Sequence, residues 1–388
     1  MEKKFVVIMI TIILLLAIIF GVRLATGPGI NFNFDGIRNI SLPEIGLFSN
    51  DTEADDEVMT QGNEEENISD THVIPGRWPL FFASPNPLDH PEAVMMAWAV
   101  QEIYARTNGG VHIEYFPAGQ LGDARDILES LEWGILEKGV VSSIVSADSR
   151  LAIDYIPYLV TSYEEAKRVW TNGSKFFEIL SEIMESKDLK LLGILPSGLR
   201  GIGTTQPFNP ATVWDFDQPS DELLIRLPTL WIFQNMADAM QLRAVPISYD
   251  ERFHVLQTGV VDGWVGGSPE VNYVEFRDVI NYFYDFRYDD YSYLIIINRS
   301  IYYALSENYR AIIFEVMQEA SVRAIEEQAE RSAYYLQRMR DHGIRVLQPT
   351  DAQREQMREA MIRRGWPQIM DELGFDQDVK DRLLEDVR

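Results

Sequence analysis

Strand-like and helix-like segments alternate along most of this 388-residue chain, and this alternation restricts the possible folds more than any other feature. Residues 111–116 (VHIEYF) alternate between apolar and polar side chains, and residues 291–298 (YSYLIIIN) are almost wholly apolar, as buried strands are. Helical patterns lie between such segments, for example the one that opens at Ser162 and stops at Gly173. The alternation predicts an α/β body, residues 77–388, with largely parallel sheets.

The N-terminus carries a targeting or anchoring segment. Lys3 and Lys4 precede the apolar run FVVIMITIILLLAIIF, residues 5–20. This run is intermediate in length between a signal-peptide core and a full membrane span, and no small-x-small cleavage site follows it. We therefore expect residues 1–25 to form a signal-anchor or transmembrane segment, with a cleaved signal peptide as the alternative. Because the positive charges come first, the rest of the chain should lie outside the cytoplasm.

The segment between this run and the body is expected to be a disordered acidic tether, residues 26–76. It shows no apolar periodicity, and residues 51–70 hold nine acidic residues and neither Lys nor Arg. A segment of this kind repels itself and stays extended. Such a tether would hold the body away from a membrane while keeping it near membrane partners.

Charge and cysteine content exclude several classes of function. The chain has 60 acidic and 34 basic residues, for a formal net charge of −26, so a nucleic-acid partner is not expected. It has no cysteine, which excludes disulfides, thiolate metal ligands and cysteine nucleophiles.

Motifs typical of enzymes are also missing. The sequence has no HExxH, no G-x-S-x-G, no P-loop and no dinucleotide-binding glycine pattern after a strand. Its five histidines are scattered and do not suggest a metal pair. We therefore expect a protein that is not an enzyme, with no catalytic residues, no cofactor and no bound metal.

Two arginines stand in apolar surroundings. Arg226 lies within LLIRLP, and Arg200 lies in ILPSGLRGIG, just beyond the strand-like segment 189–195. A guanidinium stays charged and is costly to bury without an anion, and the ends of strands in α/β sheets are common ligand sites. Each arginine is therefore a candidate for binding a ligand carboxylate, and the alternative for each is an internal salt bridge.

The order of motifs resembles that of the substrate-binding proteins of TRAP (tripartite ATP-independent periplasmic) transporters, the DctP family. The similar stretches run from about residue 77 to about residue 343 and occur in the family's order. They are ARTNGGVHIEYFPAGQLGDARDILESLEWGILE, YIPYLVTSYEEAKRVW, GLRGIGTTQPF, LLIRLP, ERFHVLQTGVVDG and LIIINRSIYYALSENYRAII.

The resemblance implies a two-lobed periplasmic-binding-protein-like α/β fold, with a long helix spanning the lobes. The expected first lobe comprises about residues 77–197 and 289–330, and the expected second lobe about residues 198–288 and 331–388. The two lobes would close on a ligand.

The resemblance also implies site residues. Arg226 falls at the position of the arginine that binds the ligand carboxylate, and Arg200 at that of a second arginine that contacts ligands in some members. Asn86 and Tyr158 lie in ligand-facing segments of the first lobe, although a turn role for Asn86 is the alternative.

One stretch departs from the family pattern. After Val-Asp-Gly, the sialic-acid and dicarboxylate binders of the family commonly have Gln-Glu-Asn, whereas this chain has Trp264, Val265, Gly266 and Gly267. Trp264 and Gly266 are therefore candidate ligand contacts, with core packing as the alternative for Trp264. A pocket with aromatic walls would suit a monocarboxylate with an apolar or ring-bearing body.

The function implied is that of an extracytoplasmic solute receptor of a TRAP-type secondary transporter. It would bind an organic acid through an arginine–carboxylate contact and deliver it to the integral-membrane permease subunits. It would act at the outer face of the cytoplasmic membrane, anchored or secreted. The alternative is a tethered receptor of the same fold that reports ligand binding to a signalling partner.

Overall fold

Two mixed β-sheets form the framework of the body. The computed structural model describes residues 79–219 and 223–387, which belong to a compact unit, Asn67–Arg388. The predicted membrane segment and tether lie outside the described residues. The first sheet is five-stranded, and its order is β2 (Ile113–Phe116), β1 (Leu80–Ala83), β3 (Lys138–Ser142), β10 (Ser292–Asn298) and β4 (Leu189–Pro196).

The second sheet is six-stranded and built from short strands. Its order is β11 (Arg345–Leu347), β9 (Tyr282–Tyr284), β5 (Ile202–Thr204), β8 (Gly263–Val265), β6 (Ile225–Leu227) and β7 (Ala244–Pro246). The prediction of largely parallel sheets was only partly right. Strand β10 runs antiparallel to β3 and β4, and β5 runs antiparallel to β8 and β9.

The antiparallel strands arise because the chain passes between the sheets through two segments that contain no helix. Residues 197–201 lead from β4 directly into β5, and residues 285–291 lead from β9 back into β10. A strand that enters a sheet without a crossover helix does not need to run parallel to its neighbours. We call residues 197–201 and 285–291 the two crossing segments.

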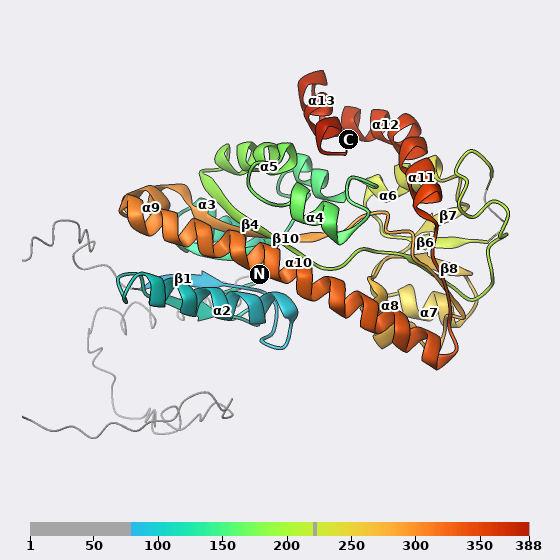
Figure 1. Ribbon diagram of the computed structural model, residues 1–388, viewed down its shortest axis with the longest axis horizontal. Coiled ribbons are helices and arrows are strands. Elements are labelled where there is room, and N and C mark those ends of the chain that lie inside the picture. Colours follow the sequence, from blue (N-terminus) through green and yellow to red (C-terminus); the bar gives the residue numbers. More distant parts are fainter. Residues whose placement is uncertain (1–78, 220–222, 388) are drawn as a thin grey trace, which may run out of the picture. The chain divides into compact units, whose positions relative to one another are not determined.

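Helices cover both sheets (Figure 1). Those between the strands of the first sheet are α2 (Pro91–Arg106), α3 (Ala124–Glu132), η1 (Ser149–Tyr155, a 3-10 helix), α4 (Tyr163–Val169) and α5 (Lys175–Glu185). Those within the second sheet are α6 (Trp231–Ala239), α7 (Arg252–Gln257) and α8 (Pro269–Phe276). The remaining helices are α9 (Arg299–Ala304), α10 (Glu307–His342), α11 (Asp351–Arg364), α12 (Trp366–Leu373) and α13 (Gln377–Asp386).

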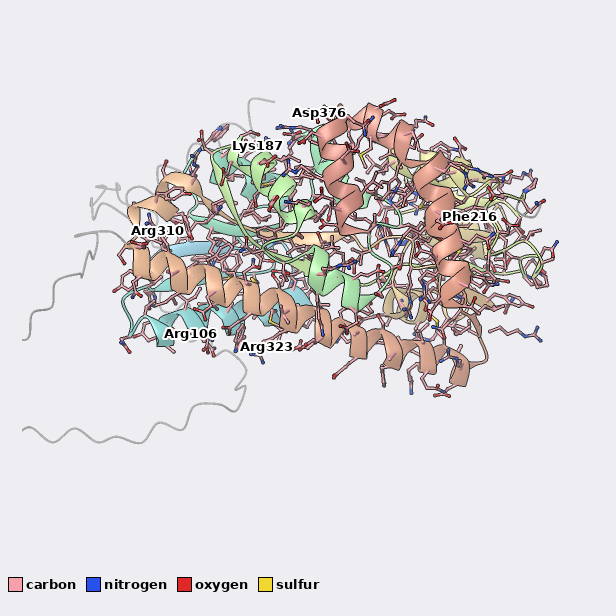
Figure 2. The ribbon with its side chains drawn as sticks, turned by 45° about the horizontal axis from the view of Figure 1, so that its top comes forward. Arg106, Lys187, Phe216, Arg310, Arg323 and Asp376 are labelled. Carbon is pink, nitrogen blue, oxygen red and sulfur yellow. The ribbon has the colours of Figure 1, made fainter. Side chains whose placement is uncertain are left out.

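Helix α10 is a single helix of 36 residues that packs against elements of both sheets, including β4, α2, α8 and β11. It comes close to β4 because Gly193 has no side chain: a Cβ there would lie 2.9 Å from the Met317 carbonyl oxygen. Figure 2 labels Arg106 on α2 and Arg323 on α10, two helices that run side by side. Arg106 joins them by donating two hydrogen bonds to Glu319, at 2.8 and 2.7 Å.

The predicted lobe assignment placed residues 331–388 in the second lobe, and the C-terminal helices contact helices associated with both sheets. Helix α11 packs against α6, α12 against both η1 and α6, and α13 against α5. The reason for the last contact is a helix cap. The Asp386 carboxylate accepts hydrogen bonds from the backbone N–H groups of Lys175 (3.1 Å) and Phe176 (2.7 Å), where α5 begins.

None of the helices described here is both long and apolar enough to cross a membrane. The predicted segment 1–25 is not among them.

Candidate functional site

A cavity of about 720 Å³ lies where elements of both sheets meet, at the ends of β4, β6 and β8. Its volume is within the usual range for small-molecule sites. The first sheet and its helices contribute aromatic and polar side chains, and the second sheet contributes the loops after β6 and β8. The residues used below are His90, Tyr155, Arg200, Arg226, Trp264, Gly266, Glu270, Glu275, Tyr291, Tyr293 and Gln328.

Arg226 lines this cavity and has no acidic partner among residues 79–219 and 223–387. It is the central residue of β6, and its side chain is only 2% exposed. Its guanidinium donates to the carbonyl oxygens of Ile247 (2.9 Å) and Val265 (3.4 Å). Burial, together with the nearby positive charge of Arg252, lowers the pKa of Arg226 to about 10. The internal salt bridge considered from the sequence is therefore not present in the described chain.

Arg200 also lines the cavity, but an internal carboxylate already occupies its guanidinium. Its Nε donates to Asp289 Oδ1 at 2.6 Å, and its Nη2 donates to Asp289 Oδ2. Burial lowers the pKa of Arg200, but the Asp289 carboxylate more than offsets this effect and holds the pKa above its ordinary value. For Arg200, the salt-bridge alternative is the arrangement that the structure contains.

The Arg200–Asp289 pair ties the two crossing segments together. Backbone bonds reinforce it, because Arg200 N–H donates to the Asp289 carbonyl at 2.9 Å. The adjacent Asp290 carboxylate accepts from the backbone N–H groups of Ser197 and Gly198, both at 2.9 Å. A rotation of one sheet relative to the other would therefore bend the chain at this hydrogen-bonded junction of the two crossing segments.

Aromatic rings surround the Arg200 guanidinium. Its central carbon lies between 5.3 and 5.9 Å from the centroids of Phe233, Tyr155, Tyr288 and Tyr291. Contacts of this kind favour a cation over a ring face. The rings therefore help to hold Arg200 at the junction.

Trp264 is 1% exposed, and most of its contacts are with the protein interior. Its Nε1–H donates to Asn272 Oδ1 at 3.0 Å, and its ring centroid is 4.2 Å from that of Phe276. Trp264 also borders the cavity, together with Gly266. Gly266 has a φ of +137°, and a Cβ there would lie 2.7 Å from the Trp264 ring, so only glycine fits.

Tyr158 and Asn86 do not line the cavity, so the geometry does not support the ligand contacts expected of them. Tyr158 is fully buried, and its ring packs edge-on against Phe216 at 5.7 Å. Asn86 donates to Glu92 Oε2 at 2.9 Å. Position in a family segment does not determine the direction in which a side chain points.

The wall on the side of the first sheet consists of residues that the sequence analysis did not single out. Tyr291 OH donates to Tyr293 OH at 3.0 Å, and Tyr293 OH lies 3.3 Å from His90 Nε2. Burial lowers the pKa of His90, so this wall is uncharged at neutral pH. The i, i+2 spacing of the two tyrosines at the start of a strand could have indicated that they share a face.

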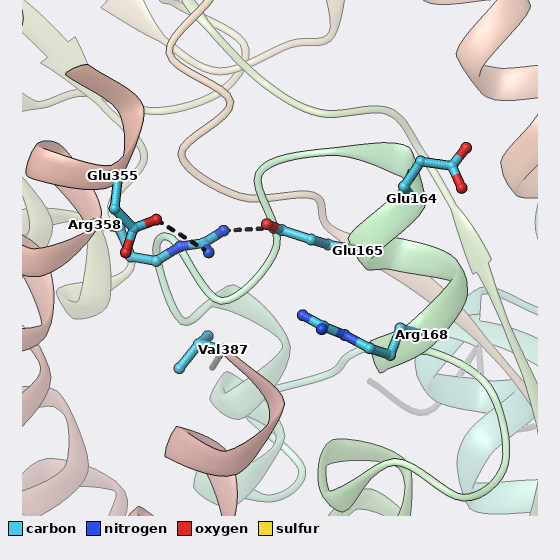
Figure 3. A pocket seen from close by; sticks show the side chains of 6 residues that line it. All are labelled: Glu164, Glu165, Arg168, Glu355, Arg358 and Val387. Carbon is cyan, nitrogen blue, oxygen red and sulfur yellow. Dashed lines mark hydrogen bonds and ion pairs between the residues drawn. The ribbon is translucent and has the colours of Figure 1, made fainter. Parts of the chain in front are cut away.

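A second hollow is more open and charged (Figure 3). It lies between α4, α11 and the C-terminal residues, and its ion pairs are internal. Arg358 pairs with Glu165 and Glu355, and Arg168 donates to the Asp386 carbonyl at 2.9 Å. These contacts connect α11 and α13 to α4.

Glu92, at the start of α2, makes stability dependent on pH. It is buried, its Oε2 accepts from Ser84 and Asn86, and its Oε1 has no hydrogen-bond partner among the described residues. Burial raises the pKa of Glu92 from 4.5 to about 7. The protonated form is therefore favoured by folding, and its contribution is complete below about pH 4.5 and is lost as the pH rises through about 7.

We predict that Glu92→Gln removes this pH dependence. Protonation of Glu92 should stabilise the wild-type protein by about 2–3 kcal/mol more at pH 5 than at pH 8. The variant should lack this contribution to the free energy of unfolding. Urea unfolding at pH 5 and pH 8 gives the change in the free energy of unfolding with pH for each protein. The exposed Glu114→Gln is the matched control. If the free energy of unfolding changes equally with pH in the wild type and in Glu92→Gln, then Glu92 is ionised in the folded protein.

The described part of the chain has no group of three or more His, Asp or Glu side chains placed to hold a metal ion. The expected independence from metals remains a prediction. We expect ligand affinity to be unchanged after exhaustive treatment with EDTA, because the charged contact to the ligand would come from an arginine. Isothermal titration before and after chelation tests this. Loss of binding that calcium or sodium restores would contradict the prediction.

Comparisons with known proteins identify similar chains. The model of a family described as bacterial extracellular solute-binding protein, family 7 (DctP), matches residues 82–370. The sialic acid-binding periplasmic protein SiaP of Vibrio cholerae is 24% identical over 72% of this chain and 84% of that protein.

Solved structures show the same fold. A TRAP periplasmic solute-binding protein from Ochrobactrum anthropi gives a TM-score of 0.70 at 22% identity, over 80% of this chain and 94% of that one. Another, from Desulfovibrio salexigens with bound orotic acid, gives a TM-score of 0.63 at 22% identity, over 80% of this chain and 99% of that one.

Proposed function

This chain belongs to the bacterial extracellular solute-binding proteins of family 7, and from that premise we propose that it captures an organic acid for a TRAP-type secondary transporter. Membership of this family makes it a solute-binding protein rather than an enzyme. The acid would bind in the cavity between the two sheets, with its carboxylate on Arg226. The loaded receptor would then deliver the acid to the membrane permease.

The observation that carries this proposal is that Arg226 is buried beside the cavity without an acidic partner among the described residues. A buried guanidinium normally has an anionic partner, because removing it from water is costly. Arg226 instead has two carbonyl partners and borders a cavity of ligand size. A carboxylate from outside would complete its hydrogen bonds and neutralise its charge.

The relatives support the class of ligand. SiaP is named for sialic acid, and the Desulfovibrio salexigens protein holds orotic acid, so both bind organic acids. A thermal-shift screen of organic acids against this protein, followed by calorimetric titration of those that bind, tests the proposal. Failure of every acid to bind would overturn it.

Delivery to a permease requires the receptor to differ between its empty and loaded forms. The two crossing segments and α10 connect the sheets and are suited to act as a hinge, and a ligand that contacts both sides would favour the closed form. The signalling alternative has no separate observation in its favour.

We propose that the protein works at the outer face of the cytoplasmic membrane. The support is the apolar run 5–20 after two lysines, together with the location usual for the family. Full-length protein should fractionate with membranes, and a protein that begins at residue 75 should be soluble and folded. Recovery of secreted protein whose mature N-terminus lies near residue 26 would show that the segment is a cleaved signal instead.

A further inference from the structure

Of the charged residues that line the cavity in the described part of the chain, all but one are paired. Glu270 accepts from Arg331, with Nε to Oε2 at 3.1 Å, and Glu275 pairs with Arg252. Arg200 pairs with Asp289, as described above. Among the described residues that line the cavity, Arg226 is left as the charge without a counterion. The cavity therefore presents a net charge of one unit to a ligand.

Gln328 is an uncharged amide residue that also lines the cavity. It projects from α10, is buried, and its Nε2 has no acceptor within the described chain. The crossing segment packs closely on it, since a Cβ at Gly198 would lie 2.5 Å from Gln328 Nε2. A buried N–H donor without a partner is destabilising. Nε2 is shielded from the cavity in this structure, so an oxygen atom of a ligand would satisfy it once the Gln328 side chain turns toward the ligand.

We propose that this cavity selects acids with a single negative charge, which place their carboxylate on Arg226 and a neutral oxygen, such as a hydroxyl or carbonyl, on Gln328. This inference rests on the proposed function, because it assumes that the cavity binds an organic acid. It goes further by excluding dicarboxylates and by assigning Gln328 to the ligand.

A second carboxylate would find no free cation among the described residues that line the cavity. Arg200, the second arginine of the cavity, is held by Asp289, and the wall of His90, Tyr291 and Tyr293 is uncharged. Glu270 and Glu275 would also repel it. Burying a carboxylate without a charged partner is strongly unfavourable.

Matched sets of acids test the charge rule on the full-length protein in mild detergent. Phenylacetate, mandelate and phenylmalonate form one set, with respectively one carboxylate, one carboxylate with a hydroxyl, and two carboxylates. Further sets on aliphatic and heterocyclic skeletons cover other body shapes. In each set that binds, the monoacid with a neutral oxygen should bind most tightly, and the diacid at least about 100-fold more weakly.

Two variants test the residues. Asp289→Asn frees Arg200, so the affinity for diacids should rise at least tenfold. Asp290→Asn, which removes the adjacent buried carboxylate without freeing an arginine, is its control. Gln328→Leu should weaken binding of the hydroxy or oxo acid by about 3- to 12-fold and leave that of the plain monoacid unchanged. If Asp289→Asn does not fold, the Gln328 variant and the acid sets still test the proposed selectivity.

The outcomes separate the two proposals. Diacids that bind the wild-type protein as tightly as monoacids would overturn this inference, as would equal losses for both monoacids in Gln328→Leu. If either of these results is found but Arg226→Met still abolishes binding of the acids, the proposed function stands. If no acid binds at all, the proposed function fails and this inference fails with it.

Discussion

Arg226→Met is expected to weaken binding of the organic acid by about 2–5 kcal/mol, because the ligand carboxylate would be buried without a charged partner. The empty protein should be at least as stable as the wild type. In the folded protein, burial lowers the pKa of Arg226 to about 10, so the charged form opposes folding at neutral pH. Replacing it with an apolar side chain of similar length should change the free energy of unfolding by between zero and a gain of about 3 kcal/mol.

Ligand titration and urea unfolding on the same variant separate ligand binding from a structural role. The partly exposed Arg277→Met is a matched control that should change neither quantity. Arg226→Lys should restore affinity only in part, since an ammonium group cannot reproduce the planar fork of a guanidinium. An empty Arg226→Met protein that is clearly destabilised but binds the acid normally would show that Arg226 is structural.

Arg200→Met is expected to have the opposite profile, with a loss of about 3–5 kcal/mol in stability whether or not ligand is present. The substitution leaves the Asp289 carboxylate buried and unpaired, next to the junction of the crossing segments. The loss should become smaller at low pH. Burial already raises the pKa of Asp289 to about 6, and without the arginine this carboxyl group would take up a proton more readily.

The double variant Arg200→Met/Asp289→Asn completes the test, because it removes both charges together. It should recover much of the stability that Arg200→Met loses, and the double-mutant cycle gives the coupling between the two side chains. An Arg200→Met protein that is as stable as the wild type, but binds acid poorly, would assign Arg200 to the ligand instead of the junction.

The two arginines show how far a local sequence pattern can be interpreted. Both stand in apolar surroundings near strand ends, and both were candidates for a ligand carboxylate. The structure pairs Arg200 with Asp289, which is 89 residues away, and leaves Arg226 bonded to carbonyl groups. The same kind of motif therefore supports different roles, and the difference depends on contacts that are distant in sequence.

The sequence by itself determined the features that depend on near neighbours. The apolar run of β10, the start of α4 after Ser162 and the alternation of strands and helices follow from periodicity and capping, which act over a few residues. The order of motifs also identified the family, which the match over residues 82–370 confirms.

Only the tertiary structure decided which side chains, helices and strands contact one another. It placed Tyr158 in the interior, α13 on α5, and β5 and β10 antiparallel to their neighbours. It also brought Gln328 and Arg226 to one cavity from segments about a hundred residues apart. The physical reason is that periodicity indicates which face of an element is buried, whereas ion pairs and buried donors depend on distances between elements that only the folded chain sets.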